Sequence, residues 1–274
     1  MRLTKKFAAC LTVLLFALMT ATVAFAAENG VDWSKGIIRA TGLGAGKSSQ
    51  EINSGVYRAQ AKRAATMDAQ RNLAEAVKGV HVTSDSSMKD LELEYDNVRT
   101  CVDTIIKGMK EVDIQYFEDG TCQVVLEMPL FGANDSLSTA AFLPVKNEPK
   151  VDFPKPVNKT IVNQNYTGLI IDCRGMNINC VMSPVIKNAD GTKIYGHMNL
   201  DIDKVISMGM ASYADDAYDQ ISSQRAGKNP LVVKAVRLDD LNANPVISVA
   251  DADKILAANA HDGFLNNCAV VFVK

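Results

Sequence analysis

The feature that most constrains this chain is an alanine-rich helical pattern that covers residues 57–78. Small side chains recur on one side of it at three- and four-residue spacing, Ala65 and Ala69 among them. A narrow face of small residues lets a helix lie close against a β-sheet. The pattern ends at Gly79, and residues 80–84 then alternate between apolar and polar side chains. We therefore expect a helix that forms the core of one domain, followed directly by a strand.

The other sides of this helix are charged. Arg71 and Glu75 lie four residues apart, so they are expected to form a surface or half-buried ion pair. We interpret the basic residues as a solvated helix face and not as a binding patch. The whole chain carries 29 basic and 31 acidic residues, for a formal net charge of −2. Such a balance offers no strong field to nucleic acid or to anionic lipid, so we expect no nucleic-acid partner.

A glycine-rich segment precedes the helix. Residues 36–49 read as a strand that runs into a sequence resembling a phosphate-binding loop. The spacing excludes that motif, because Thr41 stands where a glycine is needed five places before Gly46. We expect the glycines to turn the chain and Ser48, with Glu51 three places on, to cap the helix. A nucleotide-using enzyme built on this segment is the alternative to be tested.

The next part of the chain predicts a helix and a hairpin. Residues 89–107 have apolar side chains at helical spacing. Residues 112–117 and 121–128 alternate as strands do, and the Asp119–Gly120 pair between them is a strong hairpin signal. The first domain thus reads strand, helix, strand, helix, strand, strand, which is an α+β unit with its helices on one face of a sheet.

These motifs resemble a known family. Ala65, Ala69 and residues 70–82, followed by the Asp119–Gly120 hairpin, look like the LPP-twenty lipoprotein family and the similar amino-terminal domain of the flagellar assembly protein T. The resemblance covers about residues 37–130. It implies an envelope protein, associated with the outer membrane or with a ring around the flagellar basal body, and it brings no catalytic residues. The chain departs from the family in lacking a lipidation cysteine and in its carboxy-terminal half.

The amino terminus carries an export signal. Three basic residues precede an apolar run at residues 7–25, which ends in an A-x-A pattern at Ala26. This order is typical of a secretory signal peptide, so residues 1–26 are predicted to be removed. A retained membrane anchor is the alternative, since the run is nearly long enough to span a bilayer. Cys10 lies too early to be a lipidation site, and we expect no later membrane span.

Removal of the signal leaves an odd number of cysteines in an oxidising compartment. Cys173 and Cys180 are close enough in sequence to close a short disulfide loop, and Cys101 with Cys122 is the other local pair. The alternative is that several of the five are small buried apolar side chains. No C-x-x-C pair exists and the three histidines are scattered, so we predict no metal site and no cofactor.

The second half of the chain begins with a proline-rich stretch. Prolines cluster between residues 132 and 165, which therefore predicts a linker between a first domain at 27–131 and a second at 166–274. The second domain mixes apolar strand-like runs with helical segments, the last strand being residues 268–273. We therefore predict two α+β domains after a cleaved signal peptide, each with a mixed or antiparallel sheet and packed helices.

Only one group in the second domain looks like a site. Asp172 and Arg174 end a strand before a glycine turn, where functional residues often lie. They are candidate ligand or contact residues, although an ion pair that anchors the loop is the simpler interpretation. Serines lack a G-x-S-x-G setting and no histidine stands beside an evident partner, so no catalytic residue is assigned.

We therefore expect a non-enzymatic, exported cell-envelope protein, periplasmic or surface-associated, that acts through protein–protein contacts. Its expected partners are envelope or flagellar proteins, or a second copy of itself, and its expected role is in flagellar or outer-membrane assembly. The alternative is a binding module for an envelope ligand, with the ligand site in the second domain.

Overall fold

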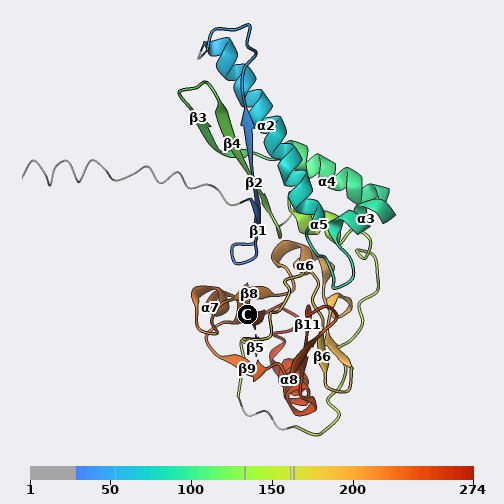
Figure 1. The fold of residues 1–274 in the computed structure, drawn as a ribbon. Coiled ribbons are helices and arrows are strands. Elements are labelled where there is room, and N and C mark those ends of the chain that lie inside the picture. Colours follow the sequence, from blue (N-terminus) through green and yellow to red (C-terminus); the bar gives the residue numbers. More distant parts are fainter. Residues whose placement is uncertain (1–28, 53, 133, 161, 163) are drawn as a thin grey trace, which may run out of the picture.

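The computed structural model describes residues 29–52, 54–132, 134–160, 162 and 164–274. The predicted signal peptide lies outside these residues. Two α+β domains lie end to end, the first drawn out along one long helix and the second more compact (Figure 1). The predicted fold class is thus confirmed. Among the described residues, no helix is long and apolar enough to cross a membrane.

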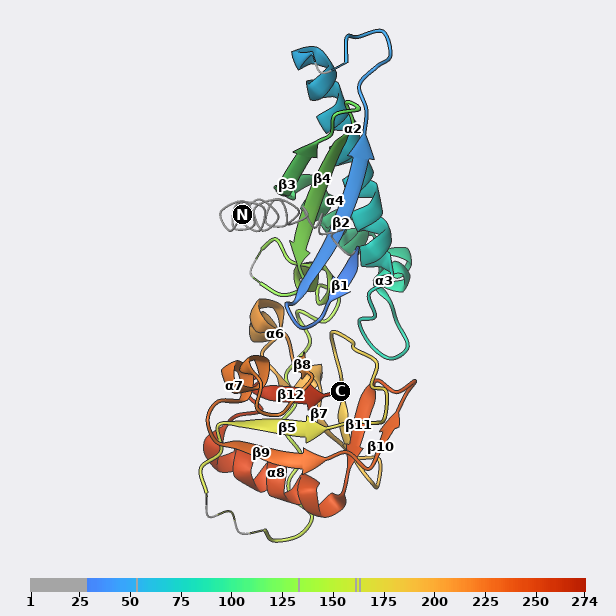
Figure 2. The same ribbon diagram turned by 60° about the vertical axis from the view of Figure 1, so that its left-hand side comes forward.

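The first domain is an antiparallel sheet with its helices on one face (Figure 2). Its strands are β1 Gly30–Asp32, β2 Ile37–Gly44, β3 Glu111–Tyr116 and β4 Cys122–Pro129, and its helices are α2 Gly55–Lys78, α3 Met88–Glu94 and α4 Asp96–Gly108. The strand order is β1-β2-β4-β3. The hairpin predicted at Asp119–Gly120 joins β3 to β4, with Gly120 at a positive φ of 84° and Asp119 accepting a hydrogen bond from the Thr121 amide.

Helix α2 lies directly on β2 because both surfaces are built from residues with almost no side chain. A Cβ atom placed on Gly42 would lie 2.1 Å from the Ala69 nitrogen, and one on Gly44 would lie 2.2 Å from the Ala65 nitrogen. Ala65, Ala69 and Leu73 are fully buried at this contact. Gly42 and Gly44 therefore lie within β2 and serve backbone-to-backbone packing, so the prediction that these glycines turn the chain is wrong. The helix itself is the core of its domain, as predicted.

Several local predictions in this domain are wrong. Residues 80–84 do not form a strand but begin a tight loop, in which the Val82 amide bonds to the carbonyl of Ser86, because Val82 is buried against the second domain. Helix α2 starts at Gly55 and is capped by Ser54, whose hydroxyl accepts from the Tyr57 amide at 3.2 Å, and not by Ser48.

Two further details differ from expectation on the helices. The helix expected at 89–107 is broken at Tyr95, which has the extended backbone angles φ −128° and ψ 107°. Arg71 pairs with Asp68 at 2.5 Å, since three-residue spacing also places the two side chains side by side, and the predicted Arg71–Glu75 pair is wrong.

The second domain combines two four-stranded sheets. Its strands are β5 Gly168–Asp172, β6 Ile186–Asn188, β7 Lys193–Tyr195, β8 Ser212–Ala214, β9 Pro230–Lys234, β10 Arg237–Asp239, β11 Asn244–Ile247 and β12 Val270–Val273. Its helices are α6 Ile202–Met208, α7 Gln220–Ala226 and α8 Val249–Asp262, with a 3₁₀ turn, η1, at His197–Asn199. One sheet, β8-β12-β5-β9, is wholly parallel, and the other, β10-β11-β6-β7, is mixed.

The parallel sheet is buried on both faces, as parallel sheets usually are. On one face Ile170, Val271 and Val273 form a small cluster beneath α7. On the other face Leu169 and Phe272 join the main core, which also contains apolar side chains of α8. This two-sided burial explains why β5 and β12 read as continuous apolar runs in the sequence.

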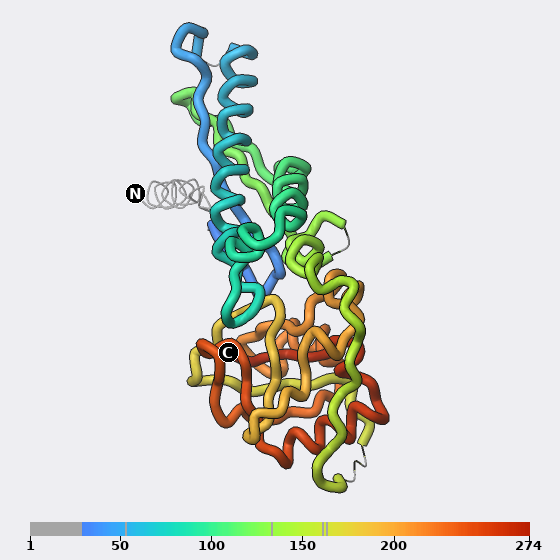
Figure 3. The backbone as a smooth tube through the Cα atoms, turned by 90° about the vertical axis from the view of Figure 1, so that its right-hand side faces the viewer, coloured from blue at the N-terminus to red at the C-terminus, as the bar shows by residue number. Residues whose placement is uncertain are grey.

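The proline-rich segment runs down the side of the second domain (Figure 3). It contains one short helix, α5 Leu137–Ala141, most of which is buried. Further along, Asp253 of α8 accepts hydrogen bonds from the amides of Val157, at 2.7 Å, and of Asn158, at 3.1 Å. The side-chain bond from Asn158 also lowers the pKa of Asp253. The segment is therefore held against the domain that follows it.

The second domain contacts both the first domain and the proline-rich segment. Trp33, in the turn between β1 and β2, meets the ring of Tyr213 edge-on, with centroids 5.6 Å apart. The loop after α2 forms a backbone hydrogen bond from the Ser183 amide to the Val82 carbonyl at 2.7 Å. Ser138, in α5 of the proline-rich segment, donates to the carbonyl of Ile206 at 2.7 Å. Most buried apolar residues of both domains belong to one connected cluster, and the small cluster beneath α7 is separate from it.

Candidate functional site

Asp172 and Arg174 form the ion pair that the sequence suggested. Arg174 donates from Nε to Oδ1 of Asp172 at 2.9 Å and from Nη2 to Oδ2 at 2.8 Å. This two-point contact lowers the pKa of the Asp172 carboxyl. Arg174 also lies 3.8 Å from the carboxylate of Asp216. The guanidinium is thus oriented by two carboxylates, which supports the interpretation of an ion pair that anchors the loop.

The parallel sheet brings further charges to the same edge. Asp172 ends β5, Lys234 ends β9, and Lys274 follows β12, where its ammonium lies 3.7 Å from Asp215. Ligands of open α/β sheets often bind outside the carboxyl ends of the strands. Here the charges alternate in sign along the sheet edge, and Asp172 and Lys274 each form an ion pair, with Arg174 and Asp215 respectively. Lys274 and Asp215 were missed in the sequence, because only the parallel strand order places them near Asp172.

The cysteines do not form a reactive centre. All five cysteines of the described residues carry free thiols in this structure, Cys173 and Cys180 included. Burial raises the pKa of Cys173 to about 12 and that of Cys180 to about 11, so both stay protonated at neutral pH. A disulfide between them under oxidising conditions stays a prediction.

The most chemically suggestive contact is one that the sequence did not reveal. His197 lies with Nδ1 3.4 Å from the hydroxyl of Ser183 and with Nε2 4.0 Å from the carboxylate of Glu148. Burial lowers the pKa of His197. Ser183 is only 4% exposed, however, so a substrate could not reach its hydroxyl. Residues 132–165 supply Glu148 from far away in the sequence, which is why this group could not be foreseen.

Neither a metal nor a phosphate site is formed by the residues considered in the sequence. No cluster of three or more His, Cys, Asp or Glu side chains suited to a metal occurs in the described part of the chain. In the glycine-rich segment, Gly42 and Gly44 are packed on α2, and the amide of Lys47 donates to Oε1 of Gln60 at 3.0 Å. The backbone there is engaged by the helix, so it does not form a phosphate cradle.

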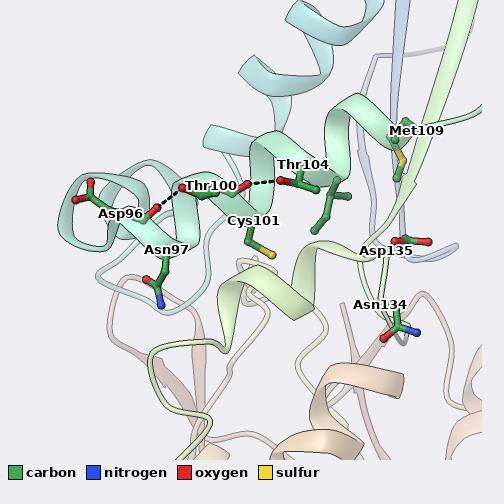
Figure 4. Close-up of a pocket in the computed structure, with 10 residues that line it drawn as sticks. Asp96, Asn97, Thr100, Cys101, Thr104, Met109, Asn134 and Asp135 are labelled. Carbon is green, nitrogen blue, oxygen red and sulfur yellow. Dashed lines mark hydrogen bonds between the residues drawn. The ribbon is translucent and has the colours of Figure 1, made fainter.

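The described residues line several hollows, and two of them are considered as candidate binding surfaces. A broad groove of about 800 Å³ runs along α4 and ends at Asn134 and Asp135 (Figure 4). A smaller pocket of about 250 Å³ lies between the domains, beside Trp33, Lys35 and Tyr213. The groove is lined mainly by one helix face, whereas the pocket takes residues from both domains.

Two polar groups of the interdomain pocket, the Tyr213 hydroxyl and the Lys35 ammonium, already have partners within the protein. The Tyr213 hydroxyl both accepts from the Val181 amide and donates to its carbonyl, each at 3.0 Å. Lys35 lies 3.1 Å from Asp32. The exposed lining of the pocket is nevertheless more polar than apolar, and Trp33 is an accessible aromatic side chain there, whereas Tyr213 is only 2% exposed.

The structure defines a two-domain class of protein. An α+β domain with an antiparallel sheet is followed by a domain with one parallel and one mixed sheet. Two family models match this division: residues 38–128 match LPP20 lipoprotein, and residues 168–274 match the second domain of Treponema pallidum Tp0624. No match was found among curated proteins. The first match confirms the family resemblance seen in the sequence and indicates an exported cell-envelope protein.

Proposed function

We propose that this protein is a non-enzymatic component of the cell envelope that acts through protein–protein contacts. The observation that carries the proposal is the LPP20 match over residues 38–128, joined to a second domain similar to one from Tp0624. Assembly of the outer membrane or of the flagellum is the setting that the sequence resemblance suggests. The partners are envelope or flagellar proteins, or a second copy of the chain.

The geometry supports a contact role over catalysis. Asp172 and Arg174 form an ion pair with each other, and the hydroxyl of Ser183 is buried beside His197. By contrast, the groove along α4 is open and mainly apolar. Such surfaces are common at protein interaction sites.

Cell fractionation tests the proposed location. The chain should be found outside the cytosol and should lack residues 1–26, as shown by the mass of the intact protein. Recovery in the cytosol with the amino-terminal segment intact would contradict the proposal. An affinity tag at Lys274 is a suitable handle for the experiment, because that end of the chain is exposed.

The second candidate function is a binding module for an envelope ligand. The interdomain pocket favours it, because pockets between domains are common ligand sites and Trp33 offers a flat aromatic surface. Soluble envelope glycans are suitable probes, since sugar rings stack on such side chains. A rise in melting temperature with the glycan, lost in Trp33→Ala, would support this function. No shift at millimolar glycan would rule out glycans as the ligand.

A further inference from the structure

We propose that the groove along α4 is a docking site for an amphipathic helix that carries basic residues at both of its ends. The proposal rests on the function proposed above and names the surface and the kind of partner. The groove floor follows one side of the helix through residues spaced three and four apart: Asn97, Thr100, Cys101, Thr104, Ile105 and Gly108.

The floor is more apolar than its residue types suggest. The Thr100 hydroxyl donates to the carbonyl of Asp96 at 2.9 Å, and the Thr104 hydroxyl donates to the carbonyl of Thr100 at 2.8 Å. Both hydroxyls are therefore occupied by their own helix (Figure 4). The methyl groups remain to contact a partner, together with the thiol of Cys101, whereas Ile105 is only 6% exposed and adds a small apolar area to the floor.

The small size of these side chains also matters. Gly108 has no atom within 4 Å of where a Cβ would lie, so the groove is open at that point. Threonine, cysteine and glycine together leave a shallow channel into which another helix can settle closely, with a few larger side chains as anchors. Helix α4 has 13 residues and is therefore about 20 Å long, which matches a partner helix of three to four turns.

Charge at the two ends of the groove defines the partner further. Asp96 lies at one end and Asp135 at the other, and both are exposed (Figure 4). No Lys or Arg is among the residues that line the groove. Arg99 lies on the other side of α4, where it lines a different hollow with Lys78 and Lys89. A partner with a basic residue near each end would meet a carboxylate at both ends and apolar surface between them.

Binding of a designed peptide to the purified mature protein tests the site. The probe is a 16-residue helical peptide with a Leu/Ala face and two lysines at each end. The control peptide has the same face and two glutamates at each end. Fluorescence anisotropy should give at least 10-fold tighter binding of the lysine peptide at low salt, and the preference should shrink at high salt.

Three variants locate the binding. Thr104→Arg fills the floor of the groove, so it should weaken binding of the lysine peptide at least 10-fold. Asp96→Asn with Asp135→Asn should remove the preference between the two peptides. Arg99→Glu, on the other side of the same helix, is the matched control. It should change the affinity for the lysine peptide by less than threefold. Circular dichroism should give the same helix content for every variant.

Cys101 provides an independent readout, because it is half-buried in the groove whereas the half-buried Cys180 lies in the second domain. The lysine peptide should slow the alkylation of Cys101 at least fivefold and leave that of Cys180 unchanged. Equal binding of both peptides, or no protection of Cys101, would overturn the docking site. Self-association abolished by Thr104→Arg would also overturn it, because the occupant would then be a second copy. Fractionation is unaffected by these results, so the docking site can fail while the proposed function stands.

Discussion

The two domains bury their main helices in opposite ways. In the first domain, α2 meets β2 through backbone atoms, with Gly42 and Gly44 facing Ala65 and Ala69. In the second domain, large side chains fill the space between elements, and its largest fully buried residues are aromatic: Tyr195, Tyr213, Phe264 and Phe272. A similar close approach does occur there at Gly168, which lies against Ala226.

The two domains therefore differ in what their packing requires of the sequence. A contact between backbones needs particular positions to have no side chain, so even one added carbon should be costly. A contact between large side chains depends on total volume and tolerates changes of similar size. The first domain should therefore be sensitive to enlargement and the second to truncation.

The largest effect is expected from Gly42→Ala. The added Cβ would lie 2.1 Å from the Ala69 nitrogen and 2.3 Å from the Ala65 carbonyl oxygen, and neither backbone atom can move aside alone. We expect a loss of about 5 kcal/mol in the free energy of unfolding, or failure of the first domain to fold. Gly55→Ala is the matched control, because nothing lies within 4 Å of its Cβ position. Equal denaturant midpoints for the two variants would show that the close contact is not needed.

The second domain should respond most to loss of a large side chain. Phe272 is fully buried in the parallel sheet and lies 5.6 Å, between ring centroids, from Tyr213. Phe272→Ala should cost about 3–5 kcal/mol in urea denaturation, because it leaves a cavity. Val232→Ala on the nearby edge strand is the control, since Val232 is 44% exposed. If the two variants lost similar stability, the packing account of this domain would be wrong.

The contact between the domains should have an intermediate effect. Trp33→Ala removes the edge-on contact with Tyr213, and we expect a loss of about 1–2 kcal/mol. With the coupling weakened, calorimetry should resolve two transitions in place of one. Tyr218→Ala is the control, because Tyr218 is 80% exposed in the second domain. A single transition at an unchanged temperature in Trp33→Ala would mean that this contact does not couple the domains.

The smallest effect concerns His197 and pH. Burial holds the folded-state pKa of His197 below its ordinary value of about 6.5. The unfolded chain therefore takes up a proton first as the pH falls, and stability should decline below about pH 6.5 and level off below the folded-state pKa. Thermal melts of the protein and of His197→Asn between pH 5 and 8 measure this. If the dependence of melting temperature on pH were unchanged in His197→Asn, that dependence would come from other titratable groups.

Sequence reasoning succeeded where local pattern and tertiary contact agree. The hairpin at Asp119–Gly120 and the helix ending before Gly79 follow from turn and helix chemistry that the rest of the molecule supports. Residues 80–84 failed because an alternating pattern also arises when two apolar residues of a loop are buried, and Val82 is buried by contact with the second domain. The helix expected at 89–107 is interrupted at Tyr95, and the break could not be predicted because no proline or glycine occurs there.

The candidate surfaces were harder to foresee than the fold. Asp172 and Arg174 were recognised because they are neighbours in the sequence. The contact of His197 with Ser183 and Glu148 depends on how the proline-rich segment is folded back. The groove along α4 exists because no other described segment covers that side of the helix. A helical pattern in the sequence does not show which side stays uncovered.

The contacts of the second domain with the first domain and the proline-rich segment also have a mechanical consequence. A single linker would leave the second domain free to swing, whereas attachments at Trp33, Val82 and Ser138 restrain rotation as well as separation. Helix α2, with 24 residues, extends about 36 Å from this junction. A force applied at the far end of α2 would therefore be carried as torque into the second domain, so that the molecule can act as a stiff lever.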